Sequence, residues 1–281
     1  MLVEQQPYQQ ISFKNLILRH LARNILARNK VFKNIHQGES CYIFGNGISL
    51  KGMDLKKFDD KISIGCGFIY LHKEFPYLNM RYCLELHPFY YYPLWKNPYS
   101  RLREKNILGA LSKKFLTDHK NLISFCSLSN YFGIRAENIY YLHNFGLKTP
   151  SLEACNLDGN FSFMQGALYG MIGLAIYMGF KKATLVGCDY THSPARSLHF
   201  YEKGEGVIHT DTNRSNNVFF ELIKQKIDLL TVTIPGTQSK DLKYVEYDKY
   251  SGEKFCYREN TQIVEKKWLN CLRDSKMYSV C

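Results

Sequence analysis

Short apolar runs that end at glycine or polar residues recur along the chain, and they predict the strands of a sheet. The first run, SCYIF at 40–44, stops at Gly45-Asn46-Gly47 and predicts a buried strand followed by a tight turn and a helix. Further runs predict strands at 61–66, 80–86, 121–125, 139–142, 183–186 and 229–234.

Helical segments lie between these strands. The segment 163–178 is strongly apolar and carries small residues at Gly166, Gly170 and Gly173, which let a helix pack closely against a sheet. A second helix is predicted at 218–226. Strands that alternate with helices are typical of an α/β fold with a mostly parallel, doubly wound, Rossmann-like sheet and helices on both faces. Such sheets bind ligands outside the carboxyl ends of their strands.

The first 36 residues differ from the rest of the chain. The segment 13–35 has apolar residues at helical spacing, six Lys or Arg and no acidic residue, so a basic amphipathic helix is predicted within 1–36, ahead of a single α/β domain at 37–281. The apolar residues at helical spacing are Phe13, Ile17, Leu21 and Ile25. Two roles stay open: the apolar stripe packs on the protein's own core, or the helix lies on an anionic membrane.

A long polar stretch separates the last two predicted strands. It runs from about residue 190 to 217 and contains His192, His199 and His209. Long polar insertions at this edge of a parallel sheet are usually binding loops or lids. The sequence therefore predicts a lid insertion over the carboxyl ends of the strands.

Composition narrows the function classes. The 281 residues include 37 Lys and Arg against 25 Asp and Glu, a formal net charge of +12, which suits an anionic ligand or surface. Nine cysteines without a C-x-x-C pair indicate neither a structural zinc site nor a disulfide framework. With no secretory leader and no run suited to a membrane span, a cytoplasmic protein is expected, peripheral on the inner face of the membrane if the N-terminal helix binds lipid.

The turn Gly45-Asn46-Gly47 is the first candidate site. Glycines directly after a strand let backbone amides approach an anionic ligand, and the Asn46 side chain can both donate and accept hydrogen bonds. Leu50 replaces the third glycine of the dinucleotide fingerprint, and no Gly-Lys-Ser/Thr follows, so neither of those phosphate-binding loops is present. An ordinary tight turn is the alternative interpretation.

A second candidate turn, Gly187-Cys188-Asp189-Tyr190, follows the strand predicted at 183–186. Asp189 can accept hydrogen bonds from ribose hydroxyls or a base amino group there, or it can cap the following turn. Because position 191 is a threonine and no second carboxylate lies nearby, Asp189 is not expected to bind a metal. The sequence predicts no metal site and no cofactor.

Two histidines are candidates for proton transfer or ligand contact. His87 follows the strand predicted at 80–86 and precedes the aromatic run at 89–92, and a structural role is its alternative. His209 lies in the predicted lid, and an imidazole there suits a general base that takes a proton from a sugar hydroxyl. His192 and His199 share that lid, so spacing alone does not choose among the three.

Three blocks of sequence, in their order along the chain, resemble glycosyltransferase family 42, a group of bacterial sialyltransferases, and the related motility-accessory-factor proteins. Gly45-Asn46-Gly47-Ile48-Ser49 matches the family's Gly-Asn-Gly-x-Ser turn. Gly179-Phe180-Lys181 and then Gly187-Cys188-Asp189-Tyr190 match its Gly-aromatic-Lys step and Gly-x-Asp-aromatic turn. His209 matches the histidine that precedes the family's next helix, and the resemblance spans about 40–235.

The resemblance implies an inverting, metal-independent transferase with a GT-A-like variant of the fold. Its donor would be a sialic acid or related nonulosonic acid linked to CMP, and its acceptor a cell-surface glycan such as lipooligosaccharide, O-antigen or capsule. Asn46 would contact the nucleotide, Asp189 its ribose or base, and His209 would deprotonate the acceptor hydroxyl. Hydrogen bonds from Tyr190 and Tyr201 would stabilise the departing phosphate. The other implied site residues are Gly45, Gly47, Ser49 and Gly187 at the nucleotide, and Gly67, His87, Gln165 and Gly166 around donor and acceptor.

The chain departs from the family pattern at three places. Cys66-Gly67 stands where the family has an asparagine, His87-Pro88 stands where it has Asn-Pro, and the serine that opens its long helix has no counterpart near Gln165-Gly166.

Two other functions stay open. One is a motility-accessory-like or pyrophosphate-transferring enzyme of the same fold, for which acidic pairs are scarce. The other is a basic nucleic-acid-binding protein, for which no RNP, zinc-finger or helix-turn-helix pattern is present. The leading hypothesis has no nucleic-acid partner and leaves a homo-oligomer open.

Overall fold

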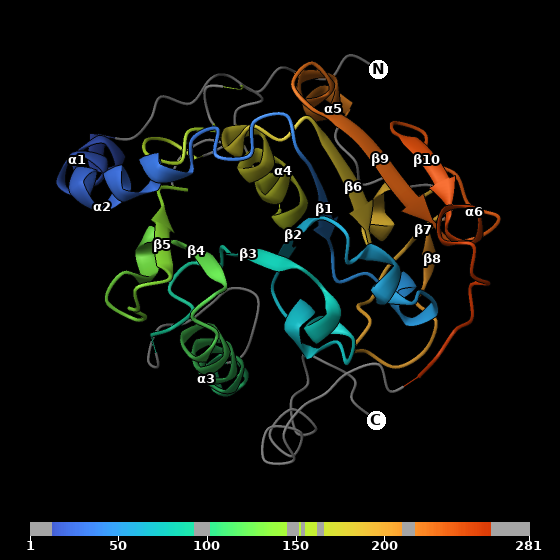
Figure 1. The fold of residues 1–281 in the computed structure, drawn as a ribbon. Coiled ribbons are helices and arrows are strands. Elements are labelled where there is room, and N and C mark those ends of the chain that lie inside the picture. The colour runs from blue at the N-terminus through green and yellow to red at the C-terminus, as the bar shows by residue number, and fades with distance from the viewer. Residues whose placement is uncertain are drawn as a thin grey trace, which may run out of the picture.

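The computed structural model describes residues 13–92, 102–144, 152, 155–161, 166–209 and 217–259. Within them, eight strands form one sheet in the order β10-β9-β6-β1-β2-β3-β4-β5, and every pair of neighbours runs parallel (Figure 1). The strands are β1 Ser40–Phe44, β2 Ile62–Cys66, β3 Met80–Glu85, β4 Ile123–Ser127, β5 Ile139–Leu142, β6 Lys182–Val186, β9 Asp228–Thr233 and β10 Lys243–Glu246. A separate antiparallel pair is formed by β7 Ala195–Arg196 and β8 Ile208–His209.

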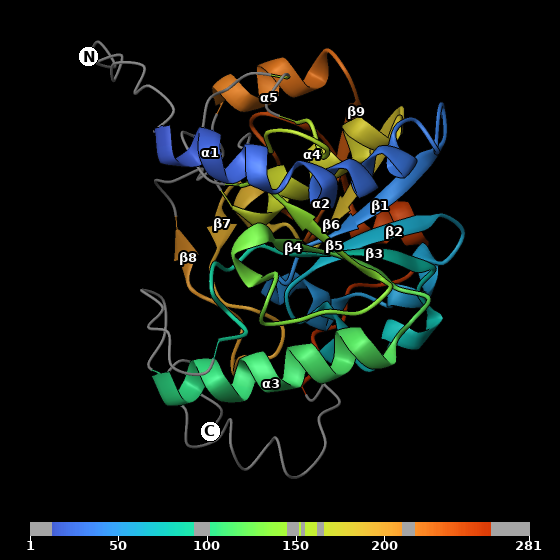
Figure 2. The same cartoon turned by 90° about the vertical axis from the view of Figure 1, so that its left-hand side faces the viewer.

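The sheet confirms the predicted α/β class. All seven predicted strands are present with ends that differ by no more than two residues, and the sheet is wholly rather than mostly parallel. Helices cover both faces, as a parallel sheet requires: α4 and α5 lie on one face and α3 on the other (Figure 2). The helices are α1 Phe13–Leu21, α2 Arg23–Ala27, α3 Leu102–Asp118, α4 Ala167–Met178, α5 Asn217–Lys224 and α6 Tyr247–Ser251. The 3-10 segments are η1 Arg28–Phe32, η2 Ile48–Gly52, η3 Leu55–Phe58, η4 Ile69–Leu71, η5 Phe75–Tyr77, η6 Leu128–Asn130 and η8 Asp189–Thr191.

Strand β1 shows how the two halves of the core are filled. Its side chains alternate between the faces, so Cys41 and Ile43 join the cluster under α4, while Tyr42 and Phe44 join the cluster on the opposite face. Helix α4 is buried almost all round and contacts β1, β2 and β3. This explains why the segment predicted as a helix at 163–178 is apolar on every side.

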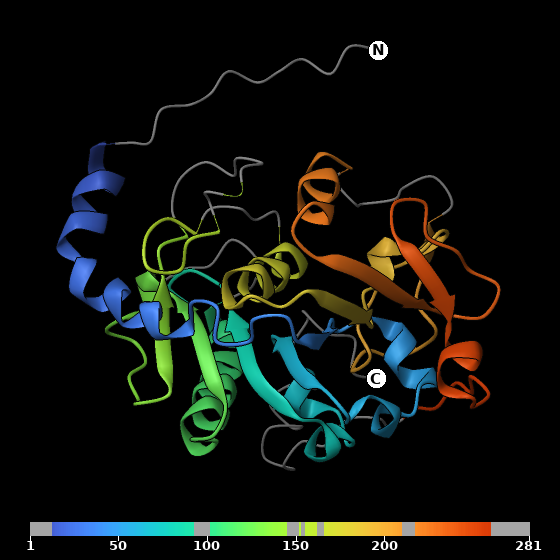
Figure 3. The same cartoon turned by 45° about the horizontal axis from the view of Figure 1, so that its top comes forward.

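The N-terminal segment corrects the prediction of one continuous amphipathic helix. Helix α1 ends at Leu21, α2 begins at Arg23, and the 3-10 segment η1 follows at Arg28, so the segment is divided into three helical pieces. The break lets the Asn29 amide reach the sheet edge, where it donates to the backbone carbonyls of Tyr141 at 2.8 Å and Leu157 at 2.7 Å. In Figure 3 the blue helices accordingly lie at the β5 end of the sheet.

The helix predicted directly after β1 is also different in the structure. Two short 3-10 segments, η2 and η3, take its place. Because all of its residues are buried, η2 has no exposed face such as a surface helix presents. The Asp54 side chain then caps η3 by accepting from the Lys56 backbone N–H at 3.1 Å.

The order of the strands creates a switch point between β1 and β6. From β1 the chain builds the sheet outward through β2 to β5, and it then returns to place β6 on the other side of β1. The segments that leave the carboxyl ends of β1 and β6 therefore turn in opposite directions. In open parallel sheets, ligands bind in the crevice at such a point.

Candidate functional site

The two glycine turns predicted as a nucleotide site meet at this switch point. The Gly45 N–H donates to the Val186 carbonyl and the Gly47 N–H to the Gly187 carbonyl, each at 2.8 Å. A Cβ added at Gly45 would lie 2.3 Å from the Gly187 oxygen, and one added at Gly47 would lie 2.4 Å from the Asp189 side chain. Only glycine permits this close approach of the two turns.

Asp189 lies in the turn after β6, and its side chain binds the segment after β1. Its carboxylate is buried and accepts from the Ser49 backbone N–H at 2.9 Å and from the Ser49 hydroxyl. The sequence analysis offered a cap on the turn that follows Asp189, but the carboxylate instead binds a residue 140 positions away, in the segment after β1. A contact from Asp189 to a ribose or base would have to share oxygens that Ser49 already uses.

Asn46 projects between the turns of β1 and β2. Its Nδ2 donates to the Cys66 carbonyl at 3.0 Å, and a Cβ on Gly67 would lie 2.9 Å from that nitrogen. Its Oδ1 is buried and has no hydrogen-bond partner in the described part of the chain. A buried acceptor without a donor is unfavourable by about 1–3 kcal/mol, so a ligand donor at this atom would be stabilising.

The described part of the predicted lid, residues 190–209, crosses over the β1 turn. Gly47 forms an isolated bridge with His199, and the Phe200 N–H donates to the Asn46 carbonyl at 3.0 Å. The Tyr201 ring stacks on His199 with centroids 5.0 Å apart and meets the edge of Phe68 at 5.8 Å. Tyr201 is thereby brought to the β1–β2 turns, whereas Tyr190 is 40% exposed on η8.

The lid histidines differ in their surroundings. His209 ends β8 opposite Ala195, is partly exposed, and has a buried Nε2 with no hydrogen-bond partner among the described residues. His192 is fully buried, and burial lowers its pKa although the negative charge of Asp189 opposes this. His199 is occupied by Glu202, whose carboxylate lies 2.8 Å from its Nδ1. Both ring nitrogens of His192 and Nε2 of His209 have no hydrogen-bond partner among the described residues. Because His192 is fully buried and His209 is partly exposed, His209 is the one that suits proton transfer.

His87 belongs to a pair that the sequence analysis missed. Its Nδ1 lies 2.5 Å from Oε1 of Glu85, the buried last residue of β3. The nearby carboxylate raises the pKa of His87, and this outweighs the opposing effect of burial. The sequence signal for this pair is its spacing, because side chains two positions apart at the end of a strand point to the same side of the sheet.

Residues from the neighbouring strands fix the segment that carries His87. The Asn130 amide donates to the His87 carbonyl at 2.8 Å, and the Asn144 amide donates to the Leu86 carbonyl at 3.4 Å. Phe89 has a φ of 54°, a left-handed conformation that non-glycine residues rarely adopt, and its N–H donates to the Ser129 hydroxyl at 3.0 Å. Strain held by surrounding contacts is common at functional sites.

The remaining predicted positions add less. Gly166 precedes α4 with a φ of 115° and has open space where a Cβ would be. Gln165 lies outside the described residues. No group of three or more His, Cys, Asp or Glu side chains in the described part of the chain is arranged to hold a metal ion.

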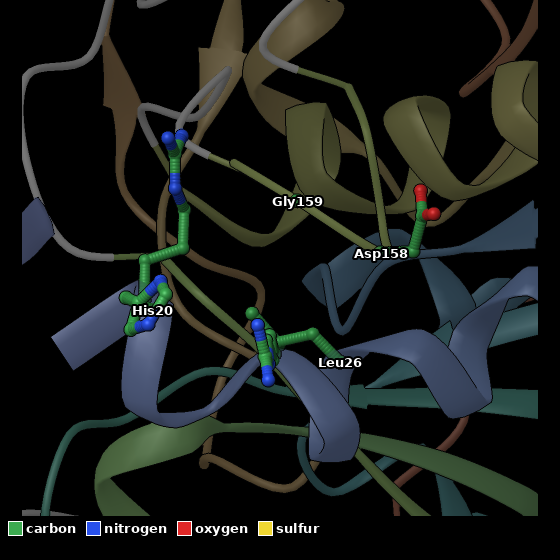
Figure 4. Close-up of a pocket in the computed structure, with 6 residues that line it drawn as sticks. His20, Leu26, Asp158 and Gly159 are labelled. Carbon is green, nitrogen blue, oxygen red and sulfur yellow. The ribbon is translucent and has the colours of Figure 1, made fainter. Parts of the chain in front are cut away.

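A pocket of about 330 Å³ lies between the N-terminal helices and the loop at 155–161. Its lining includes His20 and Leu26 on one side and Asp158 and Gly159 on the other (Figure 4). Arg19 and Arg23 complete it. None of the predicted site residues takes part.

Comparison with known proteins adds no relative. A scan of protein-family models, a search of curated proteins and a search of solved structures each found no match to the chain. The likeness to family 42 therefore rests on the three motif blocks, and the α/β Rossmann-like fold stands on the sheet itself.

Proposed function

We propose that the protein is a glycosyltransferase that moves a sialic acid, or a related nonulosonic acid, from its CMP-linked donor to a cell-surface glycan, with inversion at the anomeric carbon. One observation carries the proposal: the Gly-Asn-Gly turn lies at the switch point of a parallel sheet and places there the amide oxygen of Asn46, which is buried and has no hydrogen-bond partner among the described residues. The order of the motif blocks supports the same reaction.

In this proposal the nucleotide binds at the carboxyl end of β1, beside the turn that follows β2. Asn46 Oδ1 accepts from the cytosine amino group or a ribose hydroxyl, both of which are donors. Ser49 and Asp189 hold the turn that positions Asn46. The Tyr201 hydroxyl, with Tyr190 as its alternative, donates to the phosphate as it leaves. His209 takes the proton of the acceptor hydroxyl.

Nucleotide selectivity is the first test. Isothermal titration is expected to show CMP binding, with AMP and GMP weaker by at least about tenfold. Asn46→Ala should weaken CMP binding by about tenfold, because one buried hydrogen bond contributes about 1–1.5 kcal/mol. Gln37→Ala, a change at an exposed residue before β1, should leave the affinity unchanged.

Two results would contradict the proposal. If the protein did not bind CMP, or bound all three nucleotides equally, a CMP-linked sugar would be excluded as the donor. Salt-sensitive affinity for any polynucleotide would instead favour the nucleic-acid alternative. Nucleotide binding that needs a divalent cation would favour the pyrophosphate-transferring enzyme.

The proposed acceptor lies at a membrane, and the N-terminal segment offers a contact for it. None of the helices in the described residues is long and apolar enough to cross a membrane. Residues 17–35, the amphipathic segment, nevertheless combine exposed apolar and basic side chains. The exposed apolar residues are Ile17, Leu18, Leu21, Val31 and Ile35, and the exposed basic ones are Arg23, Arg28, Lys30 and Lys33, with Arg19 partly exposed. We propose that this segment binds the anionic lipids at the inner face of the membrane.

Vesicle sedimentation tests this contact. Leu21 is 74% exposed and Val31 is 62% exposed, so Leu21→Glu with Val31→Glu should leave the fold intact and weaken binding to vesicles that contain phosphatidylserine by at least about tenfold. Phe132→Glu is the matched control, because Phe132 is a 79% exposed aromatic residue in a different part of the chain. Equal binding by the wild type and the double variant would exclude the amphipathic segment as the membrane contact.

A further inference from the structure

We propose that Glu85 and His87 form a charged pair whose imidazolium binds the phosphate of the nucleotide and stabilises it as the leaving group. This inference rests on the proposed function. It assigns to the pair a task that the family resemblance gives to tyrosines of the lid.

The geometry makes His87 an oriented group at the edge of the sheet. Glu85 is 3% exposed, and Oε1 receives both the His87 backbone N–H at 3.3 Å and the ring Nδ1 at 2.5 Å. The His87 side chain is 47% exposed, and Glu85 fixes the Nδ1 end of its ring. The ring nitrogen that does not contact Glu85 is Nε2.

The charges around the pair favour a protonated ring. A buried carboxylate needs a cationic or hydrogen-bonding partner, and its negative charge is the first cause of the raised pKa of His87. Burial raises the pKa values of the Cys66, Cys83 and Cys126 thiols, which therefore stay neutral. Burial likewise keeps the Tyr91 phenol neutral, and the Tyr90 ring packs 5.3 Å from the imidazole.

The position suits a phosphate. His87 follows β3, which lies two strands from β1 in the sheet. Two strand spacings of roughly 4.8 Å place the Asn46 turn and the end of β3 about 10 Å apart, comparable to the length of a nucleotide. A base or ribose at Asn46 therefore leaves the phosphate near β3.

The chemical step is simple. The bond between the anomeric carbon and the phosphate oxygen breaks, and its electron pair stays on that oxygen as the acceptor oxygen bonds to the carbon. His87 Nε2–H donates a charge-assisted hydrogen bond to the phosphate as its negative charge grows. Glu85 holds the ring and maintains its charge, so it is a positioning residue.

Paired titrations with CMP and cytidine test the proposal, because cytidine lacks the phosphate. At pH 6, His87→Asn is expected to bind CMP about tenfold more weakly than the wild type, while cytidine binds both equally. Because the pKa of His87 is raised above its ordinary value of 6.5, this advantage extends above that pH and disappears as the pH rises through the pKa of His87. His119→Asn, at an exposed histidine after α3, should behave as wild type.

The outcomes separate the two proposals. CMP and cytidine binding that are equally insensitive to His87→Asn would overturn the role of the pair and leave the nucleotide site standing. A tenfold loss that does not vary from pH 6 to pH 9 would show that His87 acts without its charge, and it would overturn the proposal as well. Failure of the wild type to bind either ligand would overturn the proposed function itself, and the pair would lose its ligand with it.

Discussion

Replacing Gly45 with alanine is expected to lower the free energy of unfolding by about 3 kcal/mol. The new Cβ would lie 2.3 Å from the oxygen and 2.9 Å from the carbon of the Gly187 carbonyl, well inside contact distance. Both atoms belong to the backbone, and β1 and β6 are neighbours at the centre of the sheet. Neither strand can move away without breaking hydrogen bonds to its other neighbour, so the clash cannot be relieved locally.

Urea denaturation followed by circular dichroism measures this loss as a lower midpoint. Gly159→Ala is the matched control: its Cβ would meet the Asn156 amide at 2.8 Å, but that side chain is exposed and can rotate away. We expect less than about 1 kcal/mol of change there. Equal midpoints for Gly45→Ala and the control would show that the β1 and β6 turns do not pack as the structure has them.

Most of the sheet was predictable because each interior strand is buried on both faces. The run at 41–44, in β1, is apolar throughout, as burial on both faces requires. Strand β5 at 139–142 is an edge strand, and it was predicted because its residues are apolar and mostly buried. Strand β10, Lys243–Glu246, was not predicted, because it is an edge strand with no fully buried residue. The two-residue strands β7 and β8 are too short to give any pattern.

The breaks in the N-terminal helix depend on tertiary contacts. The apolar spacing of 13–35 is helical, yet Asn29 bonds to the edge of the sheet and Phe32 packs into the core beneath it. These contacts override a local preference that by itself would continue the helix. The interruption of the helix could be predicted only from the position of β5 in the fold.

The candidate site was partly predictable for a similar reason. The turn at Asn46 could be found locally, since glycines that follow a buried strand mark a close approach. Its attachment to Asp189 could not, because the two are joined only after the strand order brings β6 beside β1. The Glu85–His87 pair lies between these cases: the spacing was visible, but the burial of Glu85 was not.

Replacing His209 with alanine is expected to lower turnover by about 10²- to 10⁴-fold, because a general base contributes about that much. His209 Nε2 is buried without a hydrogen-bond partner among the described residues, and the proposed acceptor hydroxyl would supply one. CMP affinity should be nearly unchanged, since the nucleotide contacts lie at Asn46 and beyond β3. The two histidines thus divide the reaction: His209 acts on the acceptor and His87 on the leaving phosphate.

Release of CMP from CMP-linked sialic acid, measured with a soluble glycan acceptor, provides the readout. His119→Ala is the control, because His119 follows α3 and precedes β4 at the amino end of the sheet, away from the carboxyl ends of the strands. A His209→Ala protein that binds CMP and still turns over at the wild-type rate would remove His209 from the mechanism. If His87→Asn were slow in the same assay, the pair at the end of β3 would keep its assigned role at the leaving phosphate, beside the Tyr201 hydroxyl.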